Sequence, residues 1–270
     1  MTRMAGSDRP NLLFVMCDQM RAHALGCYGN RLTRSPFLDS MAEAGTHVEH
    51  AISNCPVCVP ARTLLLSGQY ARSSLGRPSN TALSWTDSWD NPGWSFYPYC
   101  PEKREAFPQP TMPELLQRAG YHTAAIGKWH VDAWPHQLGF DDWLIPRSFH
   151  AHSNQLFTRN GEPEFAAPGF SVDFEADEMA KFFNRRAQED APWFMYYNIS
   201  PPHMPLADMP EKYLTMYDPG DVTMRDNVER DLSKVGGHGG DFADRAAKYL
   251  WDYRNNIARL PHATRSGEGV

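Results

Sequence analysis

Two uninterrupted apolar segments, at residues 11–17 and 193–199, constrain the fold of this chain more than any other feature. Each segment runs directly into polar residues. Apolar runs of this length are typical of strands buried on both faces of a parallel sheet. A third strand is expected over residues 121–126. Because helical patterns separate these strands, the sequence predicts a layered α/β domain.

End signals predict where the first helix begins and ends. Ser35 is a suitable N-cap, Pro36 suits the first turn, and Gly45 suits a left-handed C-terminal stop. The sequence therefore predicts a helix over residues 35–45. The β-branched residues that follow indicate a short strand over residues 46–52.

Three further helices are expected. Thr111 and Glu114 form a capping box at the start of one that ends at Gly120. Helical spacing also predicts helices over residues 60–67 and 171–190.

Charge and composition exclude several classes of protein. The 26 basic and 32 acidic residues give a formal net charge of −6, which argues against a nucleic-acid-binding protein. No apolar run reaches the roughly 20 residues of a membrane span, and no secretory signal pattern is present. The five cysteines are scattered, unlike a disulfide framework. We therefore expect a cytoplasmic protein with no nucleic-acid or membrane partner.

Polar residues follow the predicted strands, where layered α/β folds bind their ligands. Asp18 and Gln19 follow the first strand, Lys128 and His130 the central one, and His203 the last. Singly, each has a structural explanation, as a turn residue, a helix cap or a buried histidine. Taken together, these residues offer hard oxygen ligands for Ca²⁺ or Mg²⁺, and groups that stabilise negative charge or move protons. Such a set suits an oxyanion ester as substrate.

Cys55 and Cys58 form a C-x-x-C pair, which has three interpretations. A redox pair lacks a thioredoxin-like context, and a zinc site lacks a second cysteine pair. The third interpretation is that both cysteines have a structural role only. The residues that follow favour none of these, because residues 58–62 fit the pattern C-x-P-x-R and a Ser-Gly-Gln segment ends at Gln69.

This pattern resembles the signature of the type I sulfatases. Other segments resemble that family in the same order, from residue 10 to about residue 217: residues 18–19, 26–29, 35–39, 127–130 and 200–205. The resemblance implies a three-layer α/β/α sandwich of the alkaline-phosphatase-like superfamily.

The resemblance also implies a chemistry centred on Cys58. A formylglycine-generating enzyme would oxidise Cys58 to formylglycine, whose hydrated form attacks sulfur. Asp18, Gln19 and the modified Cys58 would bind a divalent cation, Ca²⁺ or alternatively Mn²⁺. The implied substrate is a small-molecule sulfate ester.

The remaining site residues carry over from the same family. Arg62 would hold the formylglycine and neutralise charge, and Lys128 would contact the sulfate oxygens. His130 would take a proton as sulfate is expelled, and His203 would protonate the leaving group. These four residues and Cys58 form the predicted catalytic set.

Two departures from the family pattern leave alternatives open. Gln19 replaces a common aspartate, as it does in phosphonate monoester and phosphodiester hydrolases. The family's downstream S-D-H-G segment is not found. Residues 1–253 are therefore expected to be the N-terminal part of a sulfatase domain that is incomplete at its C-terminus, and residues 254–270 an irregular tail. An inactive truncated family member that binds Ca²⁺ weakly is the other alternative.

Overall fold

The structure is a computed structural model that describes residues 9–75, 107, 109–131, 133–146, 152–203, 209–218 and 221–222. It divides into two compact units. The first comprises Met1–Asn30 and Ser35–Leu206, and the second comprises Arg31–Arg34 and Ala207–Val270. The boundary expected at residue 253 and the tail at 254–270 lie outside the described residues.

The first unit is built on one sheet with the strand order β1-β6-β2-β3-β4-β5. Its strands are β1 (Leu12–Cys17), β2 (His122–Gly127), β3 (Asp142–Pro146), β4 (Leu156–Arg159), β5 (Phe165–Ala166) and β6 (Trp193–Ile199). The first four strands in that order are parallel, and β4 and β5 continue the sheet antiparallel. The three predicted strands β1, β2 and β6 are confirmed and lie side by side.

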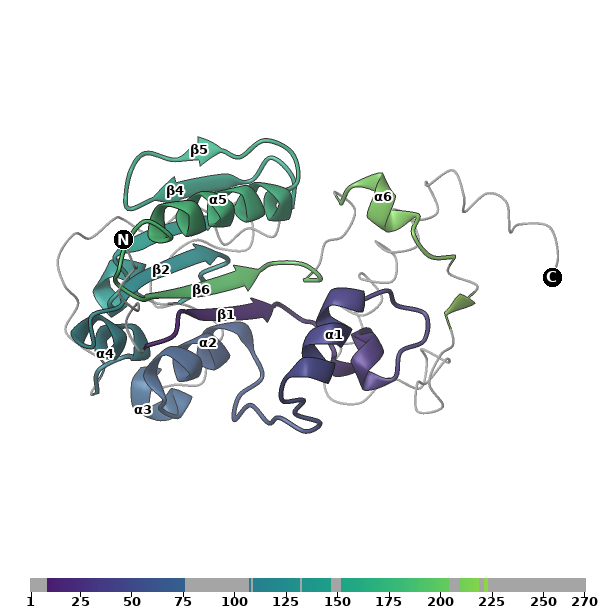
Figure 1. The fold of residues 1–270 in the computed structure, drawn as a ribbon, viewed down its shortest axis with the longest axis horizontal. Helices are drawn as coiled ribbons and strands as arrows, with labels where there is room; N and C mark the ends of the chain where they lie inside the picture. Colours follow the sequence, from purple (N-terminus) through teal and green to yellow (C-terminus); the bar gives the residue numbers. More distant parts are fainter. Residues whose placement is uncertain are drawn as a thin grey trace, which may run out of the picture. The chain divides into compact units, whose positions relative to one another are not determined.

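Helices cover both faces of this sheet, as Figure 1 shows. The helix α5 (Ser171–Arg186) lies on one face, and α2, α3 and α4 lie on the other. Their bounds are Cys58–Ser67, Ala71–Leu75 and Met112–Arg118, and α1 spans Pro36–Ala44. Short 3₁₀ helices occupy Ala22–Ala24, Gly26–Tyr28 and Pro135–Leu138. The predicted three-layer α/β/α arrangement is confirmed. In the second unit, α6 spans Glu211–Leu214.

The central strand β6 supplies side chains to two apolar clusters, one on each face. Phe194 and Tyr196 pack in the cluster that includes Leu66 of α2, whereas Met195 and Tyr197 pack in the cluster that includes Phe182 of α5. Alternate residues of a strand point to opposite faces. Burial on both faces therefore explains why this segment is apolar except at Asn198.

The segment after α1 differs from the prediction. No strand forms over residues 46–52, and Gly45 has an extended φ of −120° rather than a left-handed one. Val48 and Ile52 are 54% and 95% exposed. A β-branched run gains nothing from strand geometry when no neighbouring strand pairs with it, so this segment is irregular.

Ser35 stands at the N-cap of α1, but its hydroxyl does not cap the helix. The Ser35 hydroxyl accepts a hydrogen bond from the Gly26 amide (2.8 Å) and donates to the Asp39 carboxylate (3.1 Å). Asp39 also accepts from the Cys27 amide (2.7 Å). These bonds tie the 26–29 segment to α1, while the capping box of Thr111 is confirmed as predicted.

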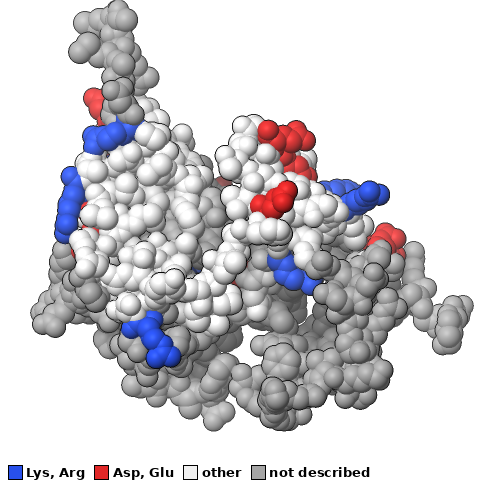
Figure 2. Space-filling view, turned by 90° about the horizontal axis from the view of Figure 1, so that it is seen from below, with Lys and Arg blue, Asp and Glu red and all other residues white. Residues whose placement is uncertain are grey.

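The strand β1 forms an open edge in the described part of the sheet, where it pairs with β6 alone. Leu13 and Val15 are 46% and 48% exposed, so the prediction that β1 is buried on both faces is wrong. Figure 2 views the molecule from below the view of Figure 1, and the described surface on this side has broad areas where charged side chains are few and scattered. An open edge strand with exposed apolar side chains promotes association between molecules.

We therefore expect residues 1–270 to self-associate and Val15→Lys to reduce this association. A lysine on an edge strand opposes strand pairing between molecules. Light scattering after size-exclusion chromatography, over a range of concentrations, measures the effect. Leu115→Lys on α4 is the control, because Leu115 is also exposed (53%) but lies on a helix and not on an edge strand. An equal effect of both substitutions would show that general solubility, not the edge, is responsible.

Candidate active site

Asp18 lies at the carboxyl end of β1, beside the end of β6. Its backbone N–H donates to the Ile199 carbonyl (2.9 Å), which continues the pairing of the two strands. The side chain is 8% exposed. Burial acts to raise the pKa of this carboxyl, but Lys128 and Arg62 outweigh burial and hold the pKa at about 2. Asp18 is therefore a carboxylate at neutral pH.

Cys58 is the first residue of α2, so its expected place at a helix N-terminus is confirmed. Its Sγ lies 3.5 Å from both Asp18 carboxylate oxygens and 3.9 Å from the Lys128 ammonium nitrogen. Burial raises the pKa of the Cys58 thiol, and Asp18 adds to the rise while Lys128 opposes it. The unmodified side chain is therefore a thiol that donates to Asp18.

Arg62 lies one turn further along α2 and is 1% exposed. Its guanidinium donates to the Asp18 carboxylate (3.3 Å), the Lys128 carbonyl (3.0 Å) and the Asn198 side-chain oxygen (2.9 Å). One buried cation therefore joins α2 to the ends of β1, β2 and β6.

Lys128 follows β2 and is 3% exposed. Its backbone N–H donates to the Asn198 carbonyl (2.9 Å), and its ammonium group pairs with Asp18. Burial lowers the pKa of Lys128, and the Asp18 carboxylate opposes this shift. The side chain thus presents a paired cation beside Cys58.

The turn that aims Lys128 depends on Gly127, which has a φ of +84°. A Cβ at this position would lie 2.1 Å from the Asn198 carbonyl oxygen. Because backbone cannot move away as a flexible side chain can, we expect Gly127→Ala to lower the free energy of unfolding by more than about 2 kcal/mol.

Urea denaturation tests this expectation, with Gly120→Ala as the matched control. Gly120 has a similar φ of +85°, but a Cβ there would meet only the end of the Arg9 side chain, at 3.3 Å. The control carries the cost of the left-handed backbone without the backbone clash. Equal losses in the two variants would contradict the proposed close approach of Gly127 and Asn198.

Two histidines complete the cluster. His130 is 5% exposed, and burial together with the charges of Lys128 and Arg62 lowers its pKa to about 3. It is therefore neutral at physiological pH and able to accept a proton. His203 follows β6, and ligand atoms of His203, Asp18 and Cys58 all lie within 4.8 Å of one another.

Gln19 is the predicted site residue that the structure does not bring into contact with the others. Its φ is +59° and its side chain is exposed. No hydrogen bond joins the Gln19 side chain to the cluster in the described part of the chain. Asn198, in contrast, contacts both Arg62 and Lys128 and was not predicted. Its sequence signal is a polar residue inside the apolar segment Trp193–Ile199.

Other candidates from the sequence lie outside the described residues. The sequence offers Asn80 as a match to a substrate contact of phosphonate and phosphodiester hydrolases, and Trp85, Trp89 and Trp94 either as loop packing, the favoured interpretation, or as pocket lining.

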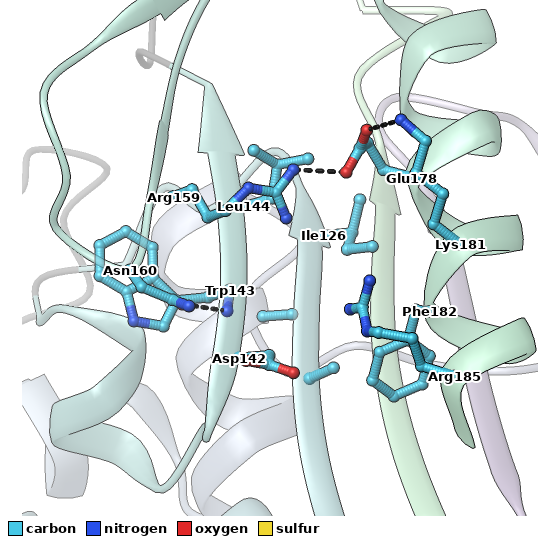
Figure 3. Close-up of a pocket in the computed structure, with 12 residues that line it drawn as sticks. Ile126, Asp142, Trp143, Leu144, Arg159, Asn160, Glu178, Lys181, Phe182 and Arg185 are labelled. Atoms are coloured by element: carbon cyan, nitrogen blue, oxygen red, sulfur yellow. Dashed lines mark hydrogen bonds and ion pairs between the residues drawn. The ribbon is translucent and has the colours of Figure 1, made fainter. Parts of the chain in front are cut away.

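A cavity of about 530 Å³ lies elsewhere, between α5 and the strands β2 and β3 (Figure 3). Glu178 at its rim accepts from Lys181 (2.6 Å) and pairs with Arg159, and Asn160 accepts from the Trp143 amide (2.7 Å). These groups satisfy one another. None of the residues that line this cavity belongs to the cluster around Asp18.

The cluster has the chemistry of an oxyanion-ester hydrolase, and the comparisons identify its family. The chain belongs to the sulfatase family, whose sequence model matches residues 10–261. The structure has the alkaline-phosphatase-like fold, as a sulfatase from Bacteroides fragilis shows at a TM-score of 0.64, with 21% identity and coverage of 98% of this chain and 61% of that one.

The curated relatives carry different sulfatase names, and arylsulfatases and steryl-sulfatases are among them. An ulvan-active sulfatase of Formosa agariphila is 29% identical over 82% of this chain and 40% of its own length. An N-acetylglucosamine-6-O-sulfatase of Bacteroides thetaiotaomicron is 29% identical over 73% of this chain and 31% of its length. A structure solved with D-glucosamine-2-N,6-O-disulfate has a TM-score of 0.59 and 28% identity, and covers 73% of this chain and 35% of that one. This chain thus spans less than half the length of these curated relatives.

The family implies a metal ion and a formylglycine, and the described residues fit part of such a centre. Asp18 offers an ionised carboxylate oxygen, and ligand atoms of Asp18, Cys58 and His203 lie close enough together that they could hold a metal ion. Among the described residues, no helix is both long enough and apolar enough to cross a membrane.

Proposed function

We propose that this chain carries those residues of a sulfatase active site that lie in the N-terminal part of the sulfatase domain. The site hydrolyses small-molecule sulfate esters. The observation that carries the proposal is the placement of Cys58 at the N-terminus of α2, beside the ion pair of the Asp18 carboxylate and the Lys128 ammonium group. That position suits a nucleophile facing an anionic ester, because helix N-termini and buried cations both favour negative charge.

We propose that a formylglycine-generating enzyme modifies Cys58, and that Asp18 and the modified Cys58 hold a divalent cation, Ca²⁺ or alternatively Mn²⁺. Gln19 would add an amide oxygen on rotation of its exposed side chain. Bound there, the cation would lower the pKa of the formylglycine hydroxyl that attacks sulfur.

The other side chains have separable roles in this proposal. Lys128 contacts the sulfate oxygens, and Arg62 holds Asp18 and Lys128 in place through its three hydrogen bonds. Neutral His130 accepts a proton as sulfate leaves. His203 donates a proton to the departing alcohol oxygen.

The names of two relatives, an ulvan-active sulfatase and an N-acetylglucosamine-6-O-sulfatase, support testing sugar sulfates, and the arylsulfatase names support testing aryl sulfates beside them. Phosphonate monoesters and phosphodiesters are the comparison substrates, because Gln19 also occurs in hydrolases of those esters.

The test is to express residues 1–270 with a formylglycine-generating enzyme and to measure hydrolysis of glucosamine 6-sulfate, an aryl sulfate and an aryl phosphodiester with Ca²⁺ or Mn²⁺. Ca²⁺ prefers six to eight oxygen ligands, whereas the described cluster offers few. We therefore expect weak Ca²⁺ binding and slow turnover, with sulfate esters preferred. Preference for the phosphodiester would overturn the proposed substrate class.

A further inference from the structure

Glu175 of α5 is a buried carboxyl group that has no place in the proposed reaction. It is 1% exposed and faces the cluster that includes Tyr197 and Met195. Among the described residues, its Oε1 has no hydrogen-bond partner, while its Oε2 accepts from the Tyr197 hydroxyl (3.2 Å). A buried carboxyl with one weak bond is costly to ionise.

The position of Glu175 connects it to the catalytic turn. A Cβ built on Gly127 would lie 3.4 Å from Glu175 Oε1, so this oxygen lies against the residue that precedes Lys128. The same turn is held by the bond from the Lys128 amide to the Asn198 carbonyl. Asn198 and the carboxyl group of α5 therefore both lie against Gly127.

Burial, not nearby charge, favours the neutral form of Glu175. Burial raises its pKa to about 8, and the Tyr197 hydroxyl bond opposes the rise only in part. No charged side chain contributes to this shift. Cys17 of β1 and Asp173 of α5 act on the Tyr197 hydroxyl instead, and raise its pKa together with Glu175. Lys128 and Arg62 are paired with Asp18.

We propose that Glu175 is a positioning residue, which supports the Gly127–Lys128 turn as an uncharged acid and ties opening of that turn to loss of its proton. The proposed function gives the turn its importance, because Lys128 is assigned to the sulfate oxygens, but the contact itself does not depend on that function. An ionised Glu175 requires water, and displacement of the turn that lies against its Oε1 would admit water.

This proposal predicts a particular pH dependence. In the native state Glu175 keeps its proton up to a pH of about 8, whereas in an opened state it loses the proton near its ordinary pKa of 4.5. Between these values the opened state binds fewer protons, so opening becomes easier as the pH rises. Opening should increase by up to about tenfold per pH unit across this window and level off above it.

Hydrogen exchange of the Lys128 amide, compared between the wild-type chain and Glu175→Gln at each pH from 5 to 9, measures this opening. Taking the ratio at equal pH removes the intrinsic pH dependence of exchange. For the Lys128 amide, we expect the ratio of the wild-type exchange rate to the Glu175→Gln exchange rate to rise from pH 5 to about 8. For a peptide from β4, we expect the same ratio to show no such rise. Glu175→Leu replaces Glu175→Gln if the latter does not fold.

Glu178→Gln is the matched control on the same helix. Glu178 is also buried (8% exposed), but Lys181 and Arg159 lower its pKa, so it stays ionised throughout this range. A ratio of wild-type to Glu175→Gln exchange rates that does not change with pH would overturn the proposal. An equal rise in the β4 peptide would also overturn it, because Glu175 would then affect global stability and not this turn. Since no substrate is used, inactivity of the chain leaves the result unchanged.

Discussion

Cys58→Ala is expected to abolish metal-dependent sulfate ester hydrolysis, with a loss of at least about 10³-fold relative to the parent chain. Cys58 Sγ lies 3.5 Å from the Asp18 carboxylate oxygens and 3.9 Å from the Lys128 ammonium nitrogen, which is the position proposed for the nucleophile. Turnover of an aryl sulfate by residues 1–270, or by a longer form of the chain, measures the loss.

Cys55→Ala is the matched control, because Cys55 is a free, partly buried cysteine three residues earlier. We expect its turnover to remain within about threefold of the parent value, since Cys55 precedes α2 and has no hydrogen bond to the cluster in the described structure. Equal losses from the two substitutions would instead support a paired role of the cysteines, as in the redox interpretation.

The second large effect is expected from Asp18→Asn, which should lower the free energy of unfolding by about 3–5 kcal/mol. Asp18 is the carboxylate that pairs with both Lys128 and Arg62, which are 3% and 1% exposed. Removing it takes away the counter-charge that these two buried cations share. Asp142→Asn is the control, since Asp142 pairs with His122 in a setting about one-third exposed and should cost less than about 1 kcal/mol.

A double substitution separates this charge effect from lost packing. If unpaired cations cause the instability, Lys128→Met in the Asp18→Asn background should recover part of the lost free energy, as measured by urea denaturation. Additive losses from the two substitutions would show that Asp18 stabilises the fold by other contacts.

The sequence predicted the parallel centre of the sheet because burial on both faces leaves a continuous apolar run. This explains why Trp193–Ile199 was predicted with its correct bounds. The strands β3, β4 and β5 were not predicted. They are two to five residues long, and such short segments carry too few side chains to show a period. The strand predicted over residues 46–52 does not form, because its β-branched residues have no neighbouring strand to pair with.

The site was predictable where a polar residue follows a strand, as at Asp18 and Lys128. It was not predictable where function depends on register. Asn198 matters because the pairing of β6 with β2 sets it opposite Gly127. Glu175 matters because one face of α5 turns it toward the same turn. Neither relation is visible before the strands are aligned.

The most direct test of the account is the mass of the tryptic peptide that contains Cys58, after co-expression of residues 1–270 with a formylglycine-generating enzyme. The account predicts that Cys58 is replaced by an aldehyde that reacts with a hydrazide probe, and that Cys55 in the same chain remains a thiol. A folded chain with an unmodified Cys58 thiol, made in cells where a known sulfatase is fully converted, would contradict it.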